Sequence, residues 1–107
     1  MPTNMPLHHM SKLFVNVFSK TYASSCWCLD ELVHILECRA KFNQTVLPIF
    51  YGIDPSVVSH QNVSYKSPFA VHEECFKVNR VKVQKWRDAL KEAADLVGWH
   101  STVIRYV

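Results

Sequence analysis

The fold is decided by residues 12–51, which read KLFVNVFSKTYASSCWCLDELVHILECRAKFNQTVLPIFY. The stretch opens on an apolar, partly β-branched run at residues 12–18, which predicts a strand covered on both faces. A polar loop follows at residues 19–25, and either Ser24 or Ser25 can cap a helix. A second strand is predicted at residues 46–51, where Pro48 removes a backbone donor and favours a sheet edge or a bulge.

The helix between these strands is expected to run from about residue 26 to residue 42. Its apolar residues recur at helical spacing and gather on one stripe against a sheet: Leu29, Leu32, Val33 and Leu36. Glu31 points away from that stripe, because successive helix positions are about 100° apart. The helix therefore carries a carboxylate that faces away from the core.

The second half of the chain is rich in helix signals. Asp54 and Pro55 predict a short helical turn to about residue 61, and Ser67 with Pro68 repeats the pattern before a second helix. A last helix ends at Gly98, before a short third strand at residues 99–104, and carries an apolar stripe of Val83, Trp86, Leu90, Ala93, Ala94 and Val97. Strands that alternate with helices predict an α/β fold with a mainly parallel sheet.

Composition limits the possible functions. The chain has 107 residues, 49% of them apolar, which fits one globular domain. Its net charge of +3, without a run of like charges, gives no reason to expect a nucleic-acid partner. No apolar stretch approaches the roughly 20 residues that span a bilayer, so we expect no membrane partner. Residues 1–11 have no apolar period and no signal-peptide pattern, and we expect a disordered leader in an intracellular chain.

Several blocks of sequence carry a resemblance to a known family. They are residues 18–32, with Trp27-Cys28-Leu29-Asp30-Glu31-Leu32; residues 46–51; residues 54–58 with Gln61; and residues 86–94 with Gly98-Trp99. In this order they closely resemble the TIR domains of plant disease-resistance receptors. The resemblance covers roughly residues 12–105, and Pro48 is usual at its place in that family.

The resemblance implies a flavodoxin-like TIR fold, with a parallel sheet and helices on both faces. It also implies innate immune signalling in the cytoplasm or nucleus, with other TIR domains and downstream signalling proteins as partners. NAD+ is then the substrate rather than a cofactor, and Glu31 falls on the family's catalytic glutamate. A carboxylate suits this reaction, because cleavage of the nicotinamide–ribose bond develops positive charge on the ribose. Trp27 is expected to line the substrate site.

The sequence also departs from the family pattern. Plant TIR domains begin with a strand, a helix and a second strand, including an Arg-Gly-containing loop, and we interpret residues 12–107 as a partial domain without them. We therefore expect an uncovered apolar face at residues 13–18, weak stability, and no NAD+ turnover by the chain alone. The first hypothesis is a TIR enzyme that uses Glu31. The alternative is an inert fragment that only binds other TIR domains, or a truncated gene product.

Other residues have plainer interpretations. Glu31 could be a solvated carboxylate near a helix start, and Trp86 is expected in the core. The spacing of Cys26 and Cys28 does not fit a zinc site, so no metal is expected, and buried structural thiols are the better interpretation. The basic residues between 77 and 85 are expected to form a solvated connector. An unrelated receiver domain would need an acidic cluster at strand ends, where only Asp54 is placed.

Overall fold

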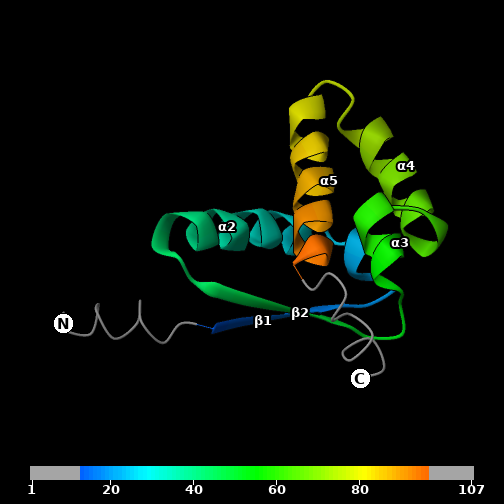
Figure 1. Cartoon of the computed structure of the whole chain (residues 1–107). Helices are drawn as coiled ribbons and strands as arrows, with labels where there is room; N and C mark the ends of the chain where they lie inside the picture. The colour runs from blue at the N-terminus through cyan, green and yellow to red at the C-terminus, as the bar shows by residue number, and fades with distance from the viewer. Residues whose placement is uncertain (1–12, 97–107) are drawn as a thin grey trace.

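The computed structural model describes residues 13–96, which form two strands and a set of helices. In chain order these are β1 (Leu13–Phe18), the 3-10 turn η1 (Tyr22–Ser24), α2 (Cys26–Phe42), β2 (Thr45–Phe50), α3 (Pro55–His60), the 3-10 turn η2 (Val63–Tyr65), α4 (Lys66–Cys75) and α5 (Arg80–Asp95). The four α-helices lie on one side of the strands, and α5 crosses α2 (Figure 1). The predicted end of the last helix at Gly98 and the predicted strand at residues 99–104 lie outside the described residues.

The two strands pair in parallel, as the strand–helix–strand order predicts. The register runs from Leu13 opposite Thr45 to Phe18 opposite Phe50. It passes Asn16 opposite Pro48 without interruption, so Pro48 introduces no bulge. Within residues 13–96 each strand has one neighbour, which places Pro48 on an edge strand.

The two faces of this sheet differ in burial. Phe18, Val46 and Phe50 lie on the face that the helices cover, and all three are buried. On the opposite face Val15 is 52% exposed, and Leu13, Val17 and Leu47 are exposed with it. The prediction of a first strand covered on both faces is therefore wrong for the described residues, while the expected uncovered apolar face is confirmed. An apolar run alone cannot show whether a second layer is present.

The helix boundaries follow local capping chemistry. The hydroxyl of Ser25 accepts from the backbone N–H of Cys28 at 3.2 Å, and α2 spans the predicted residues. Asp54 caps α3 in the same way, through Ser56 N–H at 2.9 Å. The predicted start of α4 at Ser67 is wrong, because α4 continues directly from η2 and begins at Lys66 without a side-chain cap.

Trp86 of α5 is the largest side chain in the core, and it is 1% exposed. Its ring makes edge contacts with His72 and Phe76, with centroid distances of 5.0 and 5.4 Å. Its Nε1 donates to Oδ1 of Asp30 on α2 at 2.9 Å. Trp86 therefore joins α5 to both α2 and α4, which confirms its predicted place in the core.

Candidate functional site

Glu31 lies in the second turn of α2, one turn after Trp27. Positions four apart face the same side of a helix, and both residues are exposed, Trp27 by 81%. Within residues 13–96 the Glu31 carboxylate has no hydrogen-bond partner and no ion pair. The structure therefore leaves this carboxylate available for a ligand, beside an exposed aromatic ring.

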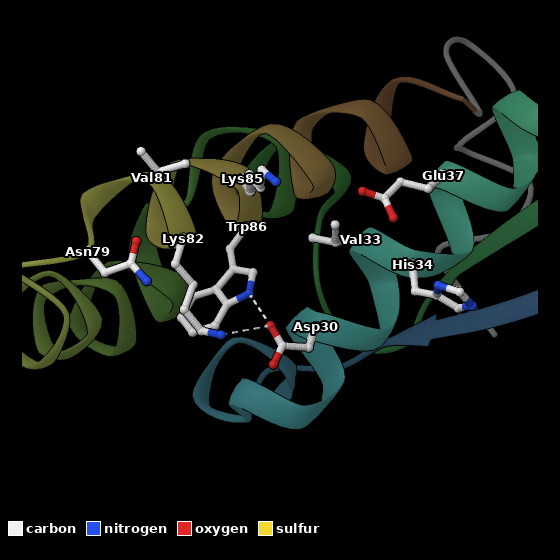
Figure 2. A pocket seen from close by; sticks show the side chains of 9 residues that line it. All are labelled: Asp30, Val33, His34, Glu37, Asn79, Val81, Lys82, Lys85 and Trp86. Carbon is white, nitrogen blue, oxygen red and sulfur yellow. Dashed lines mark hydrogen bonds and ion pairs between the residues drawn. The ribbon is translucent and has the colours of Figure 1, made fainter.

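The neighbouring carboxylate, Asp30, has a different role. Its Oδ1 accepts from Nε1 of Trp86 at 2.9 Å and lies 3.6 Å from Nζ of Lys82 (Figure 2). Nζ of Lys82 also lies 5.5 Å from the centre of the Trp86 ring. Asp30 is thus committed to the contact between α2 and α5, which distinguishes it from Glu31. The prediction of a wholly solvated basic connector is wrong for Lys82, which takes part in this contact.

Tyr22 connects the end of β1 to the start of α2. Its hydroxyl donates to the carbonyl oxygen of Cys28 at 3.1 Å and accepts from Nδ2 of Asn16 at 3.2 Å. Burial raises the pKa of Tyr22 to about 12; the hydrogen bond from Asn16 lowers it, while Cys28 and then Glu31 raise it through charge repulsion. The phenol is therefore neutral at physiological pH and lies within the electrostatic reach of Glu31.

The raised pKa of Tyr22 predicts a loss of stability in alkaline solution. The unfolded phenol loses its proton near pH 10.0 and the folded one near pH 12, so the native state binds more protons between these values. The contribution of protonated Tyr22 to the free energy of unfolding is complete below pH 10.0 and is lost as the pH rises toward 12. We expect urea midpoints to fall across this window, and to fall less steeply in Tyr22→Phe. An unchanged slope in that variant would contradict the assignment.

A hollow of 330 Å³ lies next to this region and is lined by Ser19, Lys20, Thr21, Tyr51 and Gly52. These residues follow the carboxyl ends of β1 and β2. Open parallel sheets bind ligands at that edge, and small-molecule sites have volumes from about 300 Å³ upward. Because α2 begins just after the same loop, its first turns and this hollow belong to one edge of the sheet.

A second hollow, of 380 Å³, lies between α2 and α5 (Figure 2). Asp30, His34 and Glu37 line it from α2, and Lys82, Lys85 and Trp86 line it from α5. Neither Glu31 nor Trp27 lines it. Its central polar contact, from Trp86 to Asp30, holds the two helices together, and we assign this hollow to their packing.

The cysteines of α2 are more exposed than the sequence predicts. Cys26, Cys28 and Cys38 are partly exposed, so the prediction that they are buried is wrong, although Cys26 and Cys28 pack against the core. His34 lies 3.7 Å from the sulfur of Cys38, one helical turn away on the same helix. Among residues 13–96 no group of three or more histidine, cysteine or acidic side chains could hold a metal ion.

Comparison with known proteins decides the family. The sequence model of the TIR domain matches residues 8–107. The chain belongs to the TIR domain family. This TIR domain is 50% identical over 88 residues to TMV resistance protein N of Nicotiana glutinosa. The aligned region covers 82% of this chain and 8% of that protein. It is also 50% identical over 96 residues to disease resistance protein RPV1 of Vitis rotundifolia, with coverage of 90% and 7%.

A solved structure confirms the fold class. The TIR domains in the activated Roq1 resistosome, which directly recognises the pathogen effector XopQ, superpose with a TM-score of 0.74 at 43% identity. The match covers 90% of this chain and 58% of that chain. The TIR domain described here is therefore of the plant disease-resistance type, and it spans a small part of the curated relatives. Among residues 13–96, no helix combines the length and apolarity that crossing a bilayer requires.

Proposed function

We propose that this TIR domain acts in plant immune signalling, in the cytoplasm or nucleus, and that Glu31 is the carboxylate of an NAD+-cleaving site. The remainder of that site comes from another TIR domain that associates with this one. The observation that carries the proposal is that Glu31 is exposed and has no ion pair within residues 13–96, whereas Oδ1 of Asp30 beside it contacts both Trp86 and Lys82.

The chemistry fits a carboxylate in this state. Breaking the nicotinamide–ribose bond leaves positive charge on the ribose, and a carboxylate that no lysine or arginine neutralises can stabilise that charge. Nicotinamide departs as a neutral molecule and needs no strong acid. The exposed face of Trp27, one turn away from Glu31, offers a surface on which a planar ring of the substrate can stack.

The need for another TIR domain follows from the shape of the site. Glu31 and Trp27 project from α2 into solvent, and the hollow at the strand ends is open. Electrostatic stabilisation of a transition state is strong only where water is excluded. A second domain that covers this edge would supply that exclusion. The Roq1 resistosome, in which TIR domains belong to a larger assembly, provides a precedent within the family.

The test is NAD+ consumption by a mixture of two proteins. The chain is combined with a variant of the Roq1 TIR domain in which the glutamate of the matching motif is replaced by alanine. Of the two motif glutamates, the mixture then retains that of this chain, Glu31. We expect no turnover by either protein alone and turnover by the mixture. An inactive mixture, with the chain folded by circular dichroism and bound to its partner, would contradict the proposal and leave a binding module.

The second candidate function is binding of TIR domains without catalysis, and the exposed sheet face favours it. Leu13, Val15, Val17 and Leu47 present apolar side chains side by side on β1 and β2. Full burial of an exposed valine side chain contributes about 1.5–3 kcal/mol, and these side chains are about half exposed, so a partner that covers several of them gains about half of that from each. Under this function the chain associates with another TIR domain whether or not Glu31 is present.

The exposed sheet face gives a specific prediction about association. Val15→Lys is expected to weaken binding to another TIR domain by about tenfold or more, because the ammonium would be buried without a partner. Val15 is 52% exposed, so the chain itself should stay folded. Val78→Lys is the matched control, since Val78 is 95% exposed and lies away from the sheet, between α4 and α5. Sedimentation velocity measures both, and equal weakening by the two variants would contradict this surface.

A further inference from the structure

Cys26 and His72 form a pair of side chains that lies outside the site proposed above for NAD+ cleavage. Cys26 is the first residue of α2, and His72 lies in the last turn of α4. The sulfur of Cys26 lies 3.9 Å from Nδ1 of His72, a distance suited to a hydrogen bond from a thiol. The two residues are 46 positions apart in the chain, so the tertiary fold brings them together.

A second contact fixes the orientation of the imidazole. Nε2 of His72 lies 2.7 Å from the carbonyl oxygen of Ala23. A carbonyl can only accept, so Nε2 carries the proton, and in the neutral ring Nδ1 presents its lone pair to Cys26. His72 is 4% exposed and makes edge contacts with the rings of Phe69 and Trp86. Burial and these contacts prevent the ring from turning away from the thiol.

The arrangement has the components of an activated nucleophile. A thiol lies beside a base, and the base is oriented by a third group, here the Ala23 carbonyl. The start of a helix also favours negative charge that develops on a first-turn side chain, and Cys26 occupies that position. Cys38 offers an internal comparison, because its nearby histidine, His34, is exposed and both lie beyond the first turn of α2.

We propose that Cys26 is a reactive thiol that is modified by small peroxides, with His72 as its base. Cys26 is partly exposed and packs against the core, which admits a small reagent and hinders a large one. The sulfur attacks one oxygen of hydrogen peroxide, so that an S–O bond forms and the O–O bond breaks. Nδ1 of His72 takes the thiol proton and returns a proton to the departing hydroxide, which leaves as water. The sulfur is oxidised to a sulfenic acid and the peroxide is reduced.

The test compares single-cysteine variants of the chain, in which the other cysteines are replaced by serine. Each variant is treated with hydrogen peroxide, the sulfenic acid is trapped with dimedone, and the adduct is followed by mass spectrometry. We expect Cys26 to react about tenfold faster than Cys38. We also expect His72→Gln to lower the rate at Cys26 by about tenfold. Glutamine can still donate to the Ala23 carbonyl but is not a base. His34→Gln is the matched control and should leave the rate at Cys26 unchanged.

Two results would overturn the proposal. One is a rate at Cys26 no greater than that at Cys38, and the other is an unchanged rate at Cys26 in a folded His72→Gln variant. If circular dichroism shows that His72→Gln does not fold, the comparison of Cys26 with Cys38 in chains that retain His72 decides alone. The assay contains no NAD+, so its outcome is independent of the function proposed for Glu31.

Discussion

Replacement of Trp86 with alanine is expected to unfold this TIR domain at room temperature. The side chain is 1% exposed and contacts residues of both α2 and α4. Loss of a buried tryptophan costs about 3–5 kcal/mol, and an intact small domain has only about 5–15 kcal/mol in total. Because one sheet face is exposed, we expect this domain to lie at the low end of that range. Far-UV circular dichroism of the purified variant measures the outcome.

Two matched variants separate the causes of this loss. Trp27→Ala removes the same side chain at a site that is 81% exposed, and we expect its melting temperature to stay near that of the parent. Trp86→Phe keeps most of the packing but removes the donor to Asp30, which costs only about 0.5–1.5 kcal/mol because the exposed Asp30 carboxylate can bind water instead. If Trp86→Ala melted like Trp27→Ala, α5 would not be packed as described.

Under the function proposed above, replacement of Glu31 with alanine is expected to have the largest effect on NAD+ cleavage by the mixture with the Roq1 TIR domain. A preorganised group that stabilises transition-state charge is worth about 10²–10³ in rate, so the variant should lose NAD+ cleavage to that extent. Stability should change little, because the Glu31 carboxylate has no hydrogen bond or ion pair within residues 13–96. Glu31→Gln keeps the size of the side chain without its charge, and it should lose activity to a similar extent.

Asp30→Asn provides the matched control for Glu31. It removes a carboxylate one residue away on the same helix, and the amide oxygen can still accept from Trp86. The ion pair with Lys82 is lost, which costs at most about 1 kcal/mol for a pair of this exposure. We therefore expect a small loss of stability and unchanged NAD+ cleavage. Equal loss of activity in both variants would indicate a general electrostatic effect rather than a role specific to Glu31.

Local signals in the sequence predict much of this fold. The serine cap, which the sequence leaves open between Ser24 and Ser25, the apolar stripe from Leu29 to Leu36 and the Asp54-Pro55 pair each act within a few residues of the chain. The starts of α2 and α3 follow from them. The start of α4 was less predictable, because η2 runs into α4 without a break and the Ser67-Pro68 signal falls inside the helix.

Contacts between distant residues could not be predicted in the same way. The hydrogen bond from Trp86 to Asp30 spans 56 positions, and that from His72 to Ala23 spans 49. Periodicity places Trp86 in the core and Asp30 on a helix, but it does not say which polar atoms meet. The position of Glu31 came from a family motif, while its lack of a partner within residues 13–96 became visible only in three dimensions.

The most direct test of the role of Glu31 is the initial rate of NAD+ cleavage by the mixture with the Roq1 TIR domain, measured for the parent chain, Glu31→Ala and Asp30→Asn. We expect cleavage by the parent and by Asp30→Asn, and a loss of about a hundredfold or more in Glu31→Ala. Cleavage that persists in a folded Glu31→Ala variant would show that the carboxylate responsible lies elsewhere.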